Sequence, residues 1–180
     1  MKTQSILLIM TLLMTGCTSS AKVNSPGFVV PCDQIKLAES VEKSVVLTCL
    51  DGLGEINFHQ LKGPLVINVW GSWCEGCKQE MPYFAELYQS QLFISGQIQM
   101  LGVNVEEKSK VDAIDYIQKS GMSWPNLEDT SGISKSIFGP GVPVTWFIDE
   151  NGKTIDTKIG AYTNKKQLFN QVEKAFGVKL

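Results

Sequence analysis

The chain has 180 residues, with 16 basic side chains that are all lysine, 18 acidic ones, and a net charge of −2 at pH 7. A mildly acidic protein without arginine is a poor candidate for nucleic-acid binding, because that function needs a basic surface. The length suits one domain with a sizeable core.

The first 16 residues have the pattern of an export signal. Lys2 supplies a positive start, and residues 6–14 form a short apolar core before the small-residue pair Gly16-Cys17. This apolar core is too short to cross a bilayer as a helix. We therefore expect residues 1–16 to be removed on export, which leaves 164 residues.

Residues 13–17 resemble a bacterial lipoprotein box, in which the cysteine becomes the lipidated first residue. The chain departs from the usual box because Met14 stands where leucine is common. The expected attachment point is Cys17, which would anchor the protein to the membrane, and residues 17–39 then read as a flexible tether. The alternative is cleavage by an ordinary signal peptidase, for example after Ala21, which would release a soluble exported protein.

Five cysteines are present. If Cys17 carries a lipid, the other four form two candidate pairs, Cys32 with Cys49 and Cys74 with Cys77. Structural disulfides persist in oxidising compartments outside the cytoplasm. We expect a structural disulfide between Cys32 and Cys49, and the alternative is that both are buried thiols.

Three strands are predicted before the Cys-x-x-Cys pair. Residues 45–49 and 55–58 form two short strands around a glycine-rich turn at 51–54. Residues 65–70 are apolar on both faces, which indicates a strand at the centre of a covered sheet.

The sequence Trp73-Cys74-Glu75-Gly76-Cys77 follows the central strand and opens a predicted helix. The helix N-terminus directs unpaired N–H groups and a partial positive charge at the first sulfur. This environment favours the thiolate, which is the attacking species in thiol–disulfide exchange. The second sulfur, one turn along, can close on the first or release a mixed disulfide. The spacing therefore predicts a redox-active disulfide at Cys74 and Cys77.

Other uses of such a pair fit less well. A zinc site needs further ligands, but the chain has one histidine, His59, and no second Cys-x-x-Cys. Haem attachment needs histidine directly after the second cysteine, where Lys78 stands. A purely structural disulfide across so short a loop would stabilise the fold little. We expect no metal and no other cofactor.

The middle of the chain continues with a predicted strand at 98–105. Ser109 and Asp112 resemble a capping box and predict a helix that ends at Gly121. The apolar residues expected on its inner face are Val111, Ile114 and Ile117. Residues 123–138 read as mixed loop and short helix.

The C-terminal part predicts a strand hairpin and a helix. Residues 144–148 and 154–159 are predicted strands joined at Asn151-Gly152, a strong hairpin signal. Residues 165–176 have the spacing of an amphipathic helix. The whole order of elements predicts an α/β domain with three layers, α/β/α, around a mixed central sheet.

The arrangement of Trp73-Cys74-x-x-Cys77, Pro82 and Gly141-Val142-Pro143 before a strand resembles the thioredoxin fold. The N-terminal β-hairpin, the helical insert at about 106–138 and the export signal narrow this resemblance. They make the chain similar to the TlpA/ResA-like lipoprotein or membrane-anchored thiol–disulfide oxidoreductases of the redoxin (AhpC/TSA) superfamily. The resemblance covers residues 40–178, which would form the thioredoxin-like domain.

The resemblance implies roles for several residues. Cys74 would be the exposed nucleophile and Cys77 the buried resolving thiol. Glu80 lies one helical turn beyond Cys77, where a partly buried carboxyl has a raised pKa and can exchange protons with the sulfur. Ordinary thioredoxins use an aspartate of the central strand for this task, but this chain has Asn68 there.

The resemblance also implies a substrate-binding surface at Trp73, Val142 and Pro143. Pro143 would follow a cis peptide bond and face the active-site sulfurs. The backbone of Val142 would then pair with an extended substrate segment, in the manner of an added strand.

Two departures bear on the direction of electron flow. Gly76 stands where the family usually has proline, and glycine constrains the helix start less. Glu75 adds negative charge beside the thiolate, which should raise the pKa of Cys74 and make the protein a reductant.

The function implied is reduction of selected protein disulfides outside the cytoplasm, as in cytochrome c maturation, with electrons from a membrane donor. One alternative is an oxidant or isomerase for the folding of exported proteins. Another is a copper(I)-binding chaperone, because soft thiolates suit copper(I). The copper chaperones of this fold use a different cysteine spacing and a distant histidine.

Overall fold

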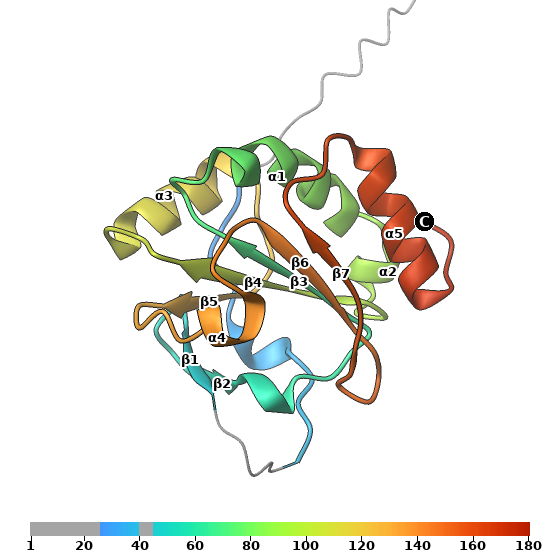
Figure 1. Ribbon diagram of the computed structural model, residues 1–180, viewed down its shortest axis with the longest axis horizontal. Coiled ribbons are helices and arrows are strands. Elements are labelled where there is room, and N and C mark those ends of the chain that lie inside the picture. Colours follow the sequence, from blue (N-terminus) through green and yellow to red (C-terminus); the bar gives the residue numbers. More distant parts are fainter. Residues whose placement is uncertain (1–25, 40–44) are drawn as a thin grey trace, which may run out of the picture.

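The computed structural model describes residues 26–39 and 45–180, which contain a mixed sheet of strand order β2-β1-β5-β4-β3-β6-β7 (Figure 1). The strands are β1 (Val46–Cys49), β2 (Glu55–Asn57), β3 (Leu65–Trp70), β4 (Gln99–Val105), β5 (Asn126–Asp129), β6 (Val144–Ile148) and β7 (Thr154–Ile159). The helices are α1 (Glu75–Tyr88), α2 (Gln91–Ile94), α3 (Lys110–Ser120), α4 (Lys135–Phe138) and α5 (Lys165–Phe176), with 3-10 turns η1 (Cys32–Gln34) and η2 (Phe58–Gln60).

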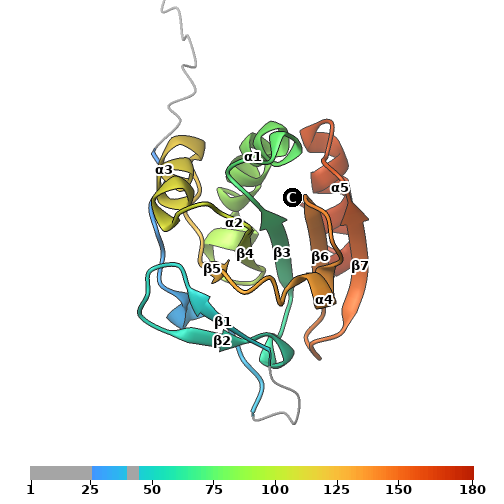
Figure 2. The ribbon, with the colours of Figure 1, turned by 60° about the vertical axis from the view of Figure 1, so that its left-hand side comes forward.

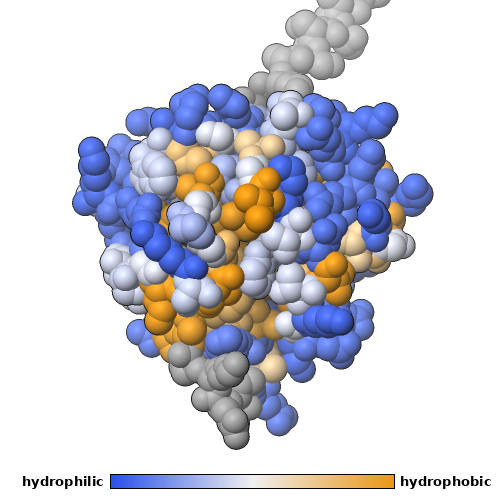
Figure 3. All heavy atoms as spheres, viewed as in Figure 1, coloured by the Kyte–Doolittle hydropathy of each residue, from blue (hydrophilic) through white to orange (hydrophobic). Residues whose placement is uncertain are grey.

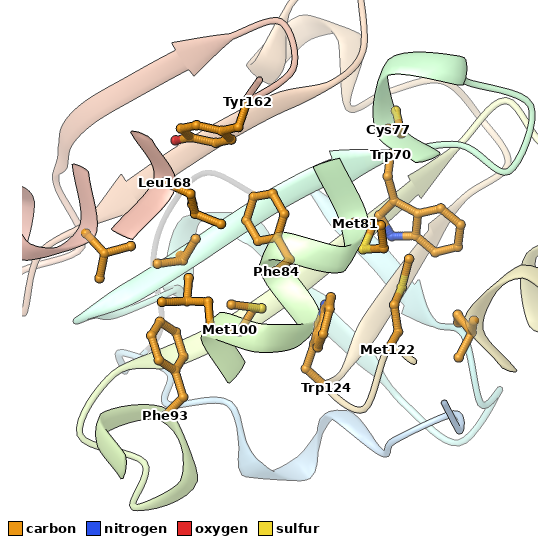
Figure 4. Packing of buried hydrophobic residues seen from close by; sticks show 14 of the residues in the cluster. Trp70, Cys77, Met81, Phe84, Phe93, Met100, Met122, Trp124, Tyr162 and Leu168 are labelled. Carbon is orange, nitrogen blue, oxygen red and sulfur yellow. The ribbon is translucent and has the colours of Figure 1, made fainter. Parts of the chain in front are cut away.

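The three long helices, α1, α3 and α5, lie on one face of the sheet, as Figures 1 and 2 show. They cover an apolar core in which Cys77 lies near Trp70 and Met81 (Figure 4). A second core covers the opposite face and includes Phe58 of η2 and Phe138 of α4. The predicted thioredoxin-like α/β fold with a mixed sheet is confirmed, and the short elements η1, η2 and α4 contribute to the cover of the second face.

Strand β3 positions the candidate site because it lies in the middle of the sheet. All of its residues are buried, and it pairs in parallel with β4 and antiparallel with β6. Val69 near its carboxyl end lies opposite Val144, the first residue of β6. The antiparallel pairing therefore brings the loop after β3, which holds Cys74, to the edge of the sheet where Pro143 precedes β6.

Most of the predicted local elements are confirmed. Ser109 caps α3, since its hydroxyl accepts a hydrogen bond from the Asp112 N–H (3.2 Å). Gly121 ends the same helix in the left-handed conformation, with φ of 80°. The Asn151-Gly152 turn joins β6 to β7 as an antiparallel hairpin. Local sequence signals were sufficient at these positions because the capping and turn geometries involve neighbours in the chain.

Strand β5 lies within residues 123–138, for which the sequence predicts mixed loop and short helix, so that prediction is wrong at Asn126–Asp129. The strand has four residues, and the polar Asn126 and Asp129 are buried. Asn126 Oδ1 accepts a hydrogen bond from Trp70 Nε1 (2.9 Å). A strand whose polar side chains find partners inside the protein lacks the alternation that marks a strand in sequence.

The predicted inner face of α3 was wrong at Val111, which is 64% exposed. The predicted Ile117 is fully buried, and Ala113, which was not predicted, faces the core with it. These two residues are four positions apart, so they share one face of the helix, whereas Val111 lies on the far side of the turn.

The packed part of the chain begins before residue 40, the boundary that the sequence suggested. The Gly27 N–H donates to Gln118 O (3.0 Å), and Val30 forms a β-bridge with Pro125. Cys32 is buried in the core of the second face. Residues 27–39 therefore lie against the domain and are held there by long-range backbone contacts, which a local sequence pattern does not predict.

The predicted signal peptide and Cys17 lie outside the described residues. Among the described residues, no helix is long and apolar enough to cross a membrane.

Cys32 and Cys49 form a disulfide in the structure, with their Cα atoms 6.1 Å apart. It joins η1 to the end of β1 and closes a loop of sequence separation 17. The pairing is the one expected from the sequence.

Replacing both cysteines, Cys32→Ser with Cys49→Ser, should lower the free energy of unfolding by about 3 kcal/mol, the value that loop-closure entropy assigns to a loop of this length. The redox potential of the Cys74–Cys77 pair should stay nearly unchanged, because Cys32 and Cys49 belong to a different core cluster from Cys74 and Cys77. Urea denaturation and equilibration with a thiol–disulfide buffer measure the two quantities. Two unreacted thiols at these positions in the exported protein, or a large change in potential, would contradict a structural role.

Candidate active site

Cys74 is the N-cap of α1 and therefore lies where the helix presents unpaired N–H groups. Its Sγ accepts a hydrogen bond from the Cys77 N–H (3.1 Å), and the two cysteines form a disulfide with Cα atoms 5.2 Å apart. Cys77 is fully buried, and Cys74 is 6% exposed. Cys74 was expected to be exposed; in the disulfide form it is only the more accessible of the two sulfurs. This site favours a thiolate at Cys74 on reduction.

Pro143 lies against the first turn of α1. A Cβ placed on Gly76 would come within 3.3 Å of Pro143 Cδ and 3.5 Å of Ala161 Cβ. The Val142–Pro143 peptide bond is cis. The absence of a side chain at position 76 thus lets the helix start approach Pro143 closely, which a bulkier residue would hinder.

Glu80 is fully buried one turn beyond Cys77, on α1. Its Oε1 accepts a hydrogen bond from Asn68 Nδ2 (3.0 Å), and its Oε2 accepts one from the Tyr162 N–H (2.9 Å). Burial raises the pKa of Glu80 to about 7, although both hydrogen bonds and the charge of Lys158 act in the opposite direction. A carboxyl that titrates near neutrality can both accept and return a proton at the pH where exchange takes place.

Trp73 directly precedes Cys74 and is 47% exposed. Its Nε1 donates a hydrogen bond to the carbonyl of Val105 at the end of β4 (3.2 Å). Glu75 is exposed and lies 3.9 Å from Lys78 Nζ. The negative charge at Glu75 is therefore partly matched by a neighbouring cation, an exposed pair of the kind that contributes little to stability.

Glu107 is a residue of this region that sequence reasoning missed. Its carboxylate accepts hydrogen bonds from the Ser72 N–H (2.5 Å) and the Ser72 hydroxyl (2.7 Å), and from Asn104 Nδ2 (2.8 Å). It thereby ties the loop before Cys74 to the end of β4. The usable signal was its position directly after a predicted strand, since parallel neighbouring strands end at the same edge of the sheet.

A small surface hollow lies beside Val142. Val69, Val105, Phe138, Pro140 and Val142 contribute to its lining. Figure 3 shows exposed apolar side chains in the middle of the face seen in Figure 1 and toward its lower left, with polar residues around them. The hollow therefore reaches Val142, the residue before Pro143, which lies against the first turn of α1.

Comparison with known proteins decides the family. The model of the AhpC/TSA family matches residues 35–156. The chain belongs to the AhpC/TSA family. The thiol-disulfide oxidoreductase ResA of Bacillus cereus is 28% identical over 177 residues, which cover 97% of this chain and 98% of that protein. ResA of Geobacillus kaustophilus is 31% identical over 128 residues, which cover 70% of this chain and 71% of that protein.

Solved structures support the fold of this AhpC/TSA family member. A secreted disulfide oxidoreductase of Mycobacterium tuberculosis, described as homologous to DsbE of E. coli, matches with a TM-score of 0.63 at 18% identity. The match covers 73% of this chain and 96% of that chain.

The family and the ResA relatives confirm the predicted enzyme class: this AhpC/TSA protein is a thiol–disulfide oxidoreductase with Cys74 and Cys77 as its redox pair. The fold brings Trp73, Glu80, Val142 and Pro143 to the same end of the sheet as this pair. His59 lies elsewhere, in η2. Among residues 26–39 and 45–180, no group of three His, Cys, Asp or Glu side chains is placed to hold a metal ion.

Proposed function

We propose that the protein reduces selected protein disulfides outside the cytoplasm, with Cys74 as nucleophile and Cys77 as resolving thiol. The observation that carries the proposal is the position of Cys74 at the start of α1, whose first turn lies against Pro143 at Gly76. An extended peptide would lie across Val142 and Pro143, with Trp73 on its other side. Ile159, which pairs opposite Val144, adds an exposed apolar side chain at this end of the sheet.

In the proposed reaction, the Cys74 thiolate attacks one sulfur of the substrate disulfide, and the other substrate sulfur leaves as a thiolate that takes up a proton. Cys77 then gives its proton to Glu80 and attacks the Cys74 sulfur. The Cys74–Cys77 disulfide forms, and the second substrate thiolate leaves. Two electrons pass to the substrate, and a membrane dithiol donor would return them to the protein.

Glu75 supports reduction as the working direction, because a negative charge beside Cys74 destabilises its thiolate and so favours the disulfide form. We expect a potential nearer to the value of about −270 mV for thioredoxin than to about −120 mV for DsbA. A potential near that of DsbA would assign the oxidant role instead.

Mixed disulfides trapped in cells by Cys77→Ser identify the substrate. Apocytochrome c is the expected partner, and trapping of folding exported proteins alone would replace it.

We also propose that Cys17 carries a lipid after removal of residues 1–16. Cys17→Ala should prevent labelling with a radioactive fatty acid and release the protein from the membrane fraction, without changing exchange activity in vitro. Cys32→Ser, with its cysteine in the folded domain, is the control and should keep the label. A wild-type protein that never takes up fatty acid would show that an ordinary signal peptidase produces a soluble exported form.

A further inference from the structure

The connection between β7 and α5 contacts both sides of the active site. The Gly160 N–H donates a hydrogen bond to the carbonyl of Pro143 (2.9 Å). The next residue, Ala161, lies beside Gly76 in the first turn of α1. The Tyr162 N–H donates to Glu80 Oε2 (2.9 Å). Three consecutive residues thus reach the cis-proline, the Cys-x-x-Cys turn and the buried carboxyl.

Lys158, near the end of β7, forms hydrogen bonds with the backbone of this connection. Its Nζ donates hydrogen bonds to the carbonyls of Ile159 (2.8 Å) and Gly160 (2.9 Å). The same Nζ lies 5.6 Å from the centre of the Tyr162 ring. No carboxylate within the described part of the chain lies within ion-pair distance of it, so its hydrogen bonds go to the connection rather than to a surface partner.

The groups that face Glu80 come from several elements. Asn68 of β3 and the Tyr162 N–H donate to it, and Tyr116 of α3 lies close enough to feel its charge. Cys77 precedes it by one turn on α1. Burial raises the pKa of both tyrosines, so they stay neutral near pH 7.

Two other charged residues near this region, Glu75 and Asp156, have partners of their own. Glu75, in the first turn of α1, is exposed and paired with Lys78. Asp156 lies on the same side of β7 as Lys158, and its Oδ2 accepts a hydrogen bond from Gln171 Nε2 of α5 (3.0 Å). Lys158 is therefore the cation that faces Glu80 within the described residues, and its charge lowers the pKa of that carboxyl.

We propose that Lys158 is a positioning residue for proton transfer at Cys77: it fixes residues 159–162 so that Tyr162 meets Glu80 and Gly160 meets Pro143. The inference rests on the proposed role of Glu80. Lys158 acts through the connection and through its charge, and it does not touch the reacting sulfurs. Its loss should therefore change how the second step of exchange depends on pH, more than it changes attack by Cys74.

The test uses the reduced full-length protein and an aromatic disulfide whose thiol product absorbs light. The first equivalent of product reports attack by Cys74, and the second reports attack by Cys77. In Lys158→Gln the midpoint of the second phase should move to higher pH, so that its rate at pH 7 falls about 3- to 10-fold, while the first phase changes less than about twofold. The two rates should converge above the midpoint. Lys158→Arg should restore the wild-type profile.

Three further variants separate the possible failures. Lys153→Gln removes an exposed lysine just before β7 and should leave both phases unchanged. If Lys153→Gln moved the pH midpoint of the second phase as far as Lys158→Gln does, the loss of any nearby positive charge would explain the effect, and the proposal would be wrong. Lys158→Met keeps the volume of the side chain and should repeat the shift if the glutamine variant folds poorly. If Glu80→Gln alters the second phase but Lys158→Gln and Lys158→Met both match the wild type, the Lys158 proposal is wrong. If Glu80→Gln itself changes nothing, the proposed role of Glu80 fails first.

Discussion

Replacing Cys74 with serine should abolish disulfide exchange, and replacing Cys77 with serine should instead accumulate mixed disulfides with substrate. The reason is the position of the two sulfurs: Cys74 caps α1, where the N-terminal N–H groups favour its thiolate, and Cys77 is fully buried one turn along. Without Cys74 the attacking group is missing, so activity should fall to the uncatalysed level. Without Cys77 the attack proceeds but the covalent product is not resolved.

The two variants are compared by exchange rate with a small disulfide and by the amount of covalent product on non-reducing gels. The Cys32→Ser/Cys49→Ser variant is the control, because it removes cysteines outside the redox pair and should keep exchange and show no trapping. Equal amounts of trapped product with Cys74→Ser and Cys77→Ser would contradict the assignment of Cys74 as the attacking thiol and Cys77 as the resolving thiol.

Replacing Glu80 with glutamine should remove the dependence of the Cys77 step on a group that titrates near pH 7. Burial raises the pKa of Glu80 to about 7, so this carboxyl is mainly protonated below that pH and mainly ionised above it. The ionised form accepts the proton of Cys77 when the reduced protein attacks, so the wild-type rate of this step should rise through pH 7. In the opposite direction the protonated form supplies a proton to the departing Cys77 sulfur, so that rate should fall through the same range.

In Glu80→Gln both steps should slow, by up to about 100-fold on the side of pH 7 where each is fastest, which is the low end of general acid–base effects. The amide keeps the size of the side chain and can still accept the hydrogen bond from Tyr162, so the fold should persist. Glu86→Gln, on the exposed side of the same helix where the native carboxylate pairs with Lys165 (2.7 Å), is the control and should change neither profile. Superimposable profiles for wild type and Glu80→Gln, with a small disulfide and with a protein substrate, would show that Glu80 plays no part in proton transfer.

The redox pair and its immediate surroundings were predictable from the sequence because the signals are local. An apolar run at 65–70, two cysteines one turn apart and a helix start directly after the strand specify where Cys74 and Cys77 lie. Glu80 follows from the same helix, since residues three apart share a face. The hairpin at Asn151-Gly152 and the cap at Ser109 are also short-range features, and the structure has both.

Contacts between distant parts of the chain were not predictable in this way. Tyr162 meets Glu80 across 82 positions, and Glu107 meets Ser72 across 35. These pairs arise because parallel β3 and β4 end at one edge of the sheet, while antiparallel β6 and β7 bring the Pro143 loop and the start of the α5 connection to that edge. The packing of residues 27–39 has the same origin, since residues 27–30 find their partners in α3 and the segment after it, and residues 36–38 find theirs at 60–62.

The sequence by itself determined the chemistry of this protein, namely two thiols at a helix start and a carboxyl one turn away. Only the tertiary structure decided the environment that tunes this chemistry. Desolvation of Glu80 requires the closed core of α1, β3 and α5, and the hydrogen bonds and charge that oppose it come from Asn68, Tyr162 and Lys158 on three different elements. A pKa near 7 depends on the balance of these surroundings, and such a balance exists only once the sheet register has brought them together.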